Sequence, residues 1–173
     1  MNFKEFLKEN IVFLDGSMGT LLQSKGLTAG ELPERWNISK PEVISAIHKA
    51  YFEAGSNVVC TNTFGASVLK FDETELEEIV KSAISNAKAA AKDVGGENRF
   101  VALDIGPLGK LLKPLGDYDF EDAVIVARNA SEIHGLALRD AEALLDCGVD
   151  LITLGNHAFG SRDIYSYLDD NTD

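Results

Sequence analysis

The chain has 173 residues, of which 45% are hydrophobic and 25% charged, and this length and composition are typical of one globular domain with its own core. The net charge of −12 at pH 7 argues against unassisted binding to nucleic acid or to an anionic membrane, because a phosphate surface requires a basic face. No apolar run reaches the length of a membrane helix, and the N-terminus does not resemble a signal peptide. We therefore expect a cytoplasmic protein.

The first part of the chain predicts a helix, a strand, a loop and a second helix. Residues 3–9 have the spacing of a short amphipathic helix, and the apolar run at 11–14 is typical of a buried parallel strand. Asp15 follows that run and opens a glycine-containing turn, and a helical turn is expected from Met18 to Ser24. The pattern predicts either a ligand-facing loop at Asp15 or a plain strand-to-helix turn.

Two capping boxes predict the starts of the next two helices. Ser39 with Glu42 predicts a helix that ends at Gly55, and Thr74 with Glu77 predicts a longer helix that ends at residues 95–96. His48 lies within the first of these helices, where we expect a partly exposed surface side chain.

Three further strands are expected within residues 57–65, 100–107 and 149–155. Strands that alternate with helices indicate an α/β fold with a parallel sheet, and ligand sites in such folds gather at the carboxyl ends of the strands. The side chains expected at those ends are Asp15, Asn62, Asp104, Asn156 and His157. We expect Asp104 to serve mainly as a structural hydrogen-bond partner.

The two cysteines, Cys60 and Cys147, each lie in or beside an apolar segment. We expect both to be buried free thiols. Neither belongs to a CxxC pair, so the sequence offers no cysteine-based zinc site of its own.

Five motifs in the first 120 residues occur in the order found in a known family. They are Leu14–Thr20, Glu34–Asn37, Pro41–Val43, Thr61–Ala66 and Asp104–Gly109. This stretch resembles the start of the homocysteine S-methyltransferase domain, as in cobalamin-dependent methionine synthase and betaine–homocysteine methyltransferase. The resemblance implies half of a TIM barrel, with four strands in this chain.

The resemblance also implies site residues, because the family holds the amino acid end of homocysteine at its first loops. Asp15 would pair with the substrate ammonium group, and the amides around Gly16, Ser17 and Met18 would accept its carboxylate. Asn62 would either line the same pocket or bond to neighbouring loop backbone.

The family activates the homocysteine sulfur on zinc held by three cysteines of later strands, which this sequence does not reach. The glutamate that helps to bind the ammonium group in the family is replaced here by Gly155. We therefore expect the chain to be inactive in methyl transfer on its own.

Residues 124–171 resemble a segment of the calcineurin-like bacterial metallophosphoesterases, chiefly through Gly155, Asn156 and His157. That resemblance implies that Asn156 and His157 are ligands of a divalent metal. Arg128 stands where that family has a carboxylate ligand, and a cation there opposes metal binding.

We interpret the 173 residues as a single α/β domain with two parts, a methyltransferase-like half-barrel over 1–120 and a phosphoesterase-like β/α segment over 121–173. Such a chimera could be natural, truncated or engineered. A four-stranded piece of a barrel has exposed strand edges, which predicts either a flavodoxin-like open sheet or self-association of two copies.

Three functions remain open at this point. The first is a homocysteine S-methyltransferase-like fragment that takes part in methionine biosynthesis, the second is a metal-dependent phosphodiesterase fragment, and the third is a non-catalytic α/β scaffold. Most of the sequence favours the first.

Overall fold

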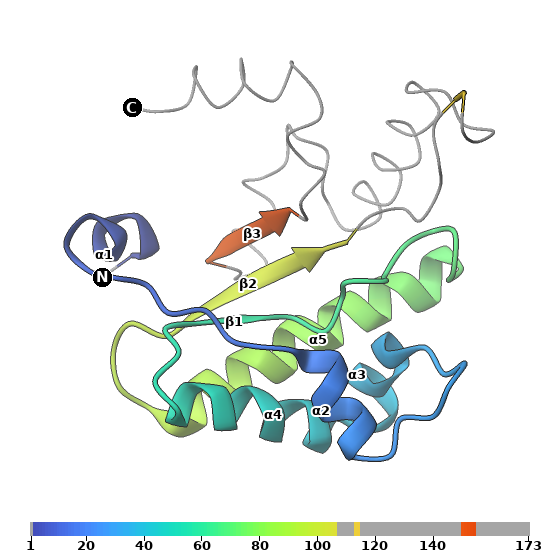
Figure 1. The fold of residues 1–173 in the computed structure, drawn as a ribbon, viewed down its shortest axis with the longest axis horizontal. Helices are drawn as coiled ribbons and strands as arrows, with labels where there is room; N and C mark the ends of the chain where they lie inside the picture. The colour runs from blue at the N-terminus through green and yellow to red at the C-terminus, as the bar shows by residue number, and fades with distance from the viewer. Residues whose placement is uncertain (1, 107–112, 115–149, 155–173) are drawn as a thin grey trace.

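The computed structural model describes residues 2–106, 113–114 and 150–154 (Figure 1). Its helices are α1 (Phe3–Glu9), α2 (Met18–Ser24), the 3-10 helix η1 (Pro33–Arg35), α3 (Trp36–Ser39), α4 (Pro41–Glu53) and α5 (Glu73–Val94), and its strands are β1 (Val58–Cys60), β2 (Phe100–Ile105) and β3 (Leu151–Leu154). None of the helices in the described part of the chain has the length and apolar character needed to cross a membrane.

The described strands form one parallel sheet in the order β1-β2-β3. Val58 lies opposite Phe100 in the first pair, and Ala102 lies opposite Leu151 in the second. The predicted α/β fold with a parallel sheet is confirmed.

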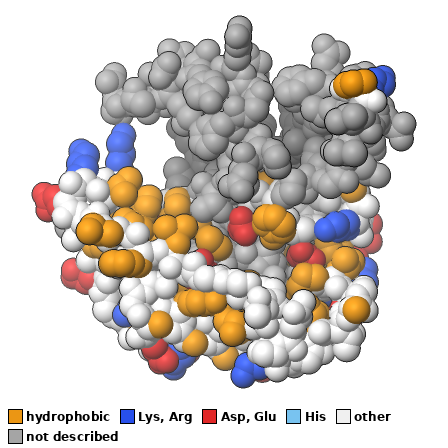
Figure 2. Space-filling view, in the orientation of Figure 1, with side chains coloured by type: hydrophobic (Ala, Val, Ile, Leu, Met, Phe, Trp, Pro, Cys, Tyr) orange, Lys and Arg blue, Asp and Glu red, His pale blue; other side chains and the backbone are white. Residues whose placement is uncertain are grey.

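The segment before α2 lies beside β1, and Leu14 forms one parallel bridge with Val58 (Figure 1). The prediction of a buried strand at 11–14 is wrong, because the exposed fractions are 80% for Ile11, 61% for Phe13 and 54% for Leu14. The physical reason is that the segment pairs with β1 on one side alone within the described residues, through amides of β1 and its preceding turn that donate to the Phe13 carbonyl. Figure 2 shows hydrophobic side chains at the surface over α1 and this segment.

One face of the sheet is covered by α4 and α5. Val59 and Val101 pack against Phe52 of α4 and Ala87 of α5. Further along β2, Leu103 packs against residues of α5. Because side chains alternate along a strand, the residues between these positions point to the opposite face.

The opposite face of the sheet is covered at one end by α1. Phe6 of α1 packs with Val58, Phe100 and Ala102, and Phe3 meets Phe100 edge to face with ring centroids 5.1 Å apart. These contacts lie at the start of the strands. The carboxyl ends of the strands therefore remain the place where loops gather.

The predicted boundaries of the helices agree with the structure better than the predicted capping residues do. The bounds of α1 and α2 are confirmed, whereas both predicted capping boxes are wrong. The N-cap of α4 is Lys40, without a side-chain hydrogen bond, because Pro41 has no N–H to satisfy in the first turn. The N-cap of α5 is Asp72, whose carboxylate accepts the Glu75 amide at 3.0 Å.

His48 is completely buried, so the prediction of a partly exposed side chain is wrong. On the same side of α4, Ser45 donates to the Asn86 carbonyl of α5 at 3.4 Å, and Phe52 packs against Ala87. Neither ring nitrogen of His48 has a hydrogen-bond partner among the described residues. Burial lowers the pKa of His48 to about 4.

Candidate functional site

Asp15 lies at the carboxyl end of the sheet, between the bridge at Leu14 and α2. Its amide donates to the Val58 carbonyl at 3.0 Å, and its Oδ2 accepts the Cys60 amide at 2.8 Å. Burial raises the pKa of Asp15 and the charge of Asp104 raises it further, while hydrogen bonds from the Cys60 amide and thiol act against this. The carboxylate is thus held in place but only partly stabilised in its charged form.

No lysine or arginine of the described residues forms an ion pair with Asp15. A cationic group brought by a ligand would therefore favour the charged carboxylate, which burial and Asp104 disfavour. This arrangement suits the recognition of an ammonium group.

The turn after Asp15 presents backbone rather than side chains. The Ser17 hydroxyl caps α2, where it accepts the Thr20 amide at 3.4 Å and lies 2.9 Å from the Thr20 hydroxyl. Met18 begins α2 and packs against the cluster that contains Leu22 and Trp36. Because the side chains of Ser17 and Met18 are both bonded or packed within the chain, a ligand at this turn would contact its backbone amides.

Asn62 is buried in the loop after β1. Its Nδ2 donates to the Pro33 carbonyl at 2.8 Å, and its own carbonyl accepts Asn37 Nδ2 at 2.8 Å. The side chain thus bonds to the backbone of η1, whereas a bond to loop backbone was one of its two predicted roles. A contact between Asn62 and a substrate stays a prediction.

The backbone of Asp104, near the end of β2, forms hydrogen bonds with the residues that follow β1. Its amide donates to the Thr61 hydroxyl at 3.2 Å, and its carbonyl accepts the Thr63 hydroxyl at 2.7 Å. Since the Cys60 amide holds the Asp15 carboxylate and the hydroxyls of Thr61 and Thr63 bond to the Asp104 backbone, the residues at the end of β1 contact both acidic residues of this edge of the sheet.

Sequence reasoning missed Glu34 and Asn37, which are buried polar residues next to the site. Glu34 Oε1 accepts the Gly65 amide at 2.7 Å, whereas its Oε2 is buried and has no hydrogen-bond partner in the part of the chain that the structure describes. Asn37 Nδ2 also donates to the Glu34 carbonyl at 2.9 Å. These contacts fasten η1 and α3 to the loop after β1. The polar residues of the Glu34–Asn37 motif were the available signal, but nothing in the motif indicated their burial.

Replacement of Gly65 by alanine should lower the free energy of unfolding by about 1–3 kcal/mol, because the new Cβ would overlap the Glu34 carboxylate. Glu34 is buried and bonded to the same residue, so it has little room to withdraw. Chemical denaturation measures the effect. Gly19→Ala is the matched control, since Gly19 lies in α2 with open space around it, and that change should stabilise the chain. Equal stability of the two variants would contradict the prediction.

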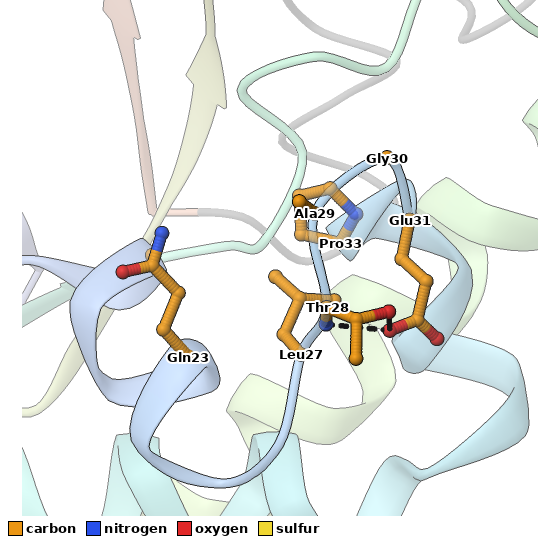
Figure 3. Close-up of a pocket in the computed structure, with 8 residues that line it drawn as sticks. Gln23, Leu27, Thr28, Ala29, Gly30, Glu31 and Pro33 are labelled. Atoms are coloured by element: carbon orange, nitrogen blue, oxygen red, sulfur yellow. Dashed lines mark hydrogen bonds between the residues drawn. The ribbon is translucent and has the colours of Figure 1, made fainter.

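A surface hollow of about 480 Å³ lies beside this site, between α2 and the loop that leads to η1 (Figure 3). Its lining residues are Gly19, Gln23, Leu27, Thr28, Ala29, Gly30, Glu31 and Pro33. Glu31 accepts both the amide and the hydroxyl of Thr28 at 2.7 Å, so its carboxylate is already engaged within the rim. Asp15 does not line this hollow, and we place the site at the turn.

The described residues do not fit a zinc site. They contain no group of three or more His, Cys, Asp or Glu side chains that could hold a metal, and Cys60 is the cysteine among them. Asn156 and His157 lie outside the described residues, as do Arg128 and Cys147. Their predicted roles, including the divalent metal site, stay predictions.

Comparison with known proteins gives a family match. The model of the homocysteine S-methyltransferase family matches residues 12–156. This range includes every element from α2 to β3 and passes through the junction predicted near residue 120. The division into two parts and the phosphoesterase resemblance stay predictions.

Similar curated proteins are the methionine synthases of Mycobacterium tuberculosis and Mycobacterium leprae. Each is 30% identical to this chain, over 91% of the chain and 14% of the relative. The chain therefore spans about one seventh of the length of these relatives.

Similar solved structures are those of the homocysteine methyltransferase MmuM from Escherichia coli. The oxidised form has a TM-score of 0.59 and 21% identity, and the match covers 86% of this chain and 54% of that one. The apo form has a TM-score of 0.58 and 23% identity, with 86% and 50% covered. At this level of identity the likeness supports the fold.

Proposed function

Because the chain belongs to the homocysteine S-methyltransferase family, we propose that it binds the amino acid end of homocysteine at the turn formed by residues 15–18. Asp15 pairs with the ammonium group of the ligand. The backbone amides of Gly16, Ser17 and Met18 accept the ligand carboxylate.

The environment of Asp15 is the observation that carries this proposal. The carboxylate is half-buried and anchored by the Cys60 amide, it has no ion pair among the described residues, and its charged form is disfavoured by burial. An ammonium group that arrives with the ligand supplies the missing opposite charge. A hydrogen-bonded charge pair in such a place gives specificity as well as affinity.

The proposal assigns this chain substrate binding rather than complete methyl transfer. The family resemblance implies a zinc ion held by three cysteines, and the sequence contains two cysteines, Cys60 and Cys147, which are not adjacent.

Calorimetric titration tests the proposal. Homocysteine should bind with one site per chain, and 4-mercaptobutanoate, which keeps the thiol and the carboxylate but lacks the ammonium group, should bind far more weakly. Absence of heat with homocysteine at millimolar concentration, or equal affinity for the two ligands, would refute ammonium recognition by Asp15.

We further propose that two copies of the chain associate through the segment at 11–14. Its side chains are apolar and exposed, and among the described residues it pairs with β1 alone, so it is a sheet edge that favours further pairing. Light scattering should report a dimer at micromolar concentration, and Phe13→Lys should give a monomer. Leu69→Lys, a substitution at another exposed apolar position, should leave the dimer intact. A wild-type chain that stays monomeric would contradict this.

A further inference from the structure

Tyr51 connects the hydrophobic core to the proposed substrate turn. It lies near the end of α4, and its ring packs at the border of two core clusters, one around Leu22 and Trp36 and the other around Phe52 and Val59. Its hydroxyl donates to the Ser17 carbonyl at 3.2 Å. The ring is thus anchored in the core while the hydroxyl reaches the turn.

Gly16 lies directly against the same side chain. A Cβ at Gly16 would be 3.0 Å from the Tyr51 hydroxyl oxygen and 3.2 Å from the nearest ring carbon. The absence of a side chain at Gly16 therefore lets the Tyr51 ring approach the backbone of the turn. Burial raises the pKa of Tyr51 and the charge of Asp15 raises it further, which agrees with a phenol close to that carboxylate.

The hydrogen bond to Ser17 has a consequence for the next amide. In a trans peptide the carbonyl and the following N–H point in opposite directions within one rigid plane. Because Tyr51 holds the Ser17 carbonyl on the α4 side, the Met18 N–H must point away from α4. That direction leaves the N–H available to a ligand instead of to the core.

We propose that Tyr51 is a positioning residue of the homocysteine site, which orients the Ser17–Met18 peptide so that the Met18 amide faces the ligand carboxylate. The proposal rests on the proposed function and adds to it the residue that sets the geometry of the carboxylate contact.

The test replaces Tyr51 by phenylalanine, which removes the hydroxyl and keeps the ring. Homocysteine affinity should fall about 3- to 10-fold, the loss expected for one hydrogen bond. Affinity for 3-aminopropanethiol, which keeps the ammonium and the thiol but lacks the carboxylate, should not change. Equal losses for both ligands, or no loss for homocysteine, would overturn the proposal.

Ile47→Val is the matched control, because Ile47 is buried in the same helix and the change loosens the cluster on which Met18 and Tyr51 pack, while the hydrogen bond from Tyr51 to Ser17 is kept. It should leave the affinity for both ligands as in the wild type. If Ile47→Val and Tyr51→Phe weaken homocysteine binding equally, a general loosening of the core explains the effect and positioning is refuted.

A measurement without ligand separates this proposal from the proposed function. In NMR spectra the Met18 amide resonance should shift far more in Tyr51→Phe than in Ile47→Val, because Tyr51→Phe removes the hydrogen bond that holds the Ser17–Met18 peptide plane and Ile47→Val keeps it. If wild-type protein fails to bind homocysteine, the proposed function fails while the shift still supports the role of Tyr51 in the turn. An unshifted Met18 resonance overturns that role whatever the ligand does.

Discussion

Replacement of Asp15 by asparagine is expected to weaken homocysteine binding about 30- to 150-fold, because loss of one member of a hydrogen-bonded charge pair costs about 2–3 kcal/mol. Asparagine keeps an oxygen that can accept the Cys60 amide, so the turn should stay in place. Calorimetric titration of variant and wild type measures the loss. Asp93→Asn is the matched control, since Asp93 is exposed in α5 and carries the same charge.

The loss should be specific to the ammonium group. Asp15→Asn should bind homocysteine and 4-mercaptobutanoate with similar affinity, because the contact that distinguishes the two ligands has gone. A variant that still prefers homocysteine as strongly as the wild type does would contradict ammonium recognition at Asp15.

The pKa of Asp15, raised chiefly by burial, gives this binding a pH dependence. Homocysteine affinity should be constant near neutral pH and should fall in acid as the carboxylate takes up a proton. Asp15→Asn should not show that fall. Parallel pH profiles for the variant and the wild type would assign the fall to another group.

The same variant should be more stable than the wild type at neutral pH. A carboxyl group whose pKa is raised on folding favours the folded state below its unfolded pKa, and this contribution is lost as the pH rises through the folded pKa. At pH 7 the charged Asp15 therefore costs stability, and the neutral asparagine does not. An equal or lower melting temperature for Asp15→Asn would contradict this.

Features that depend on neighbours in the sequence were predictable. The spacing of apolar residues predicted the bounds of α2. The apolar run that ends in a glycine-containing turn predicted that Asp15 lies at the carboxyl end of the sheet. Even here the cap of α5 was misplaced by two residues, because Asp72 competes with Thr74 and a carboxylate at a helix start is the better partner for the free amides.

Features that depend on distant residues were not predictable. Tyr51 bonds to Ser17 across 34 residues, and Glu34 bonds to Gly65 across 31. A helix pattern shows that a residue faces the core, but it does not show which backbone its polar atom will meet. The prediction that residues 11–14 are buried was wrong for a related reason. Burial of this run requires neighbours on both sides, and the structure describes β1 on one side.

His48 shows how contacts on two sides of a helix change what a pattern predicts. One side of α4 packs on Leu22 and Trp36 through Ile44 and Ile47, and another packs on the sheet and α5 through Phe52. When a helix is covered on two sides, it also buries residues that lie outside the main apolar face predicted from its sequence. The histidine is therefore buried although its residue type suggested exposure.

The free energy of unfolding should fall by about 2 kcal/mol between pH 7.5 and pH 5 because of His48 alone. Its pKa is about 4 in the folded protein against an ordinary 6.5, so the unfolded chain takes up a proton in this range and the folded chain does not. This contribution of His48 to the free energy of unfolding is thus fully present above pH 6.5, and it is lost as the pH falls towards 4. Denaturant unfolding at several pH values measures the fall.

His48→Leu should remove this component of the pH dependence. At pH 5 the variant should gain about 2 kcal/mol over the wild type relative to their difference at pH 7.5, since every other group titrates in both proteins. Leucine also removes two buried ring nitrogens that lack partners, so we expect the variant to be no less stable at pH 7.5. Parallel stability curves for the two proteins would mean that His48 reaches solvent or finds a partner in the folded state, and would contradict its complete burial.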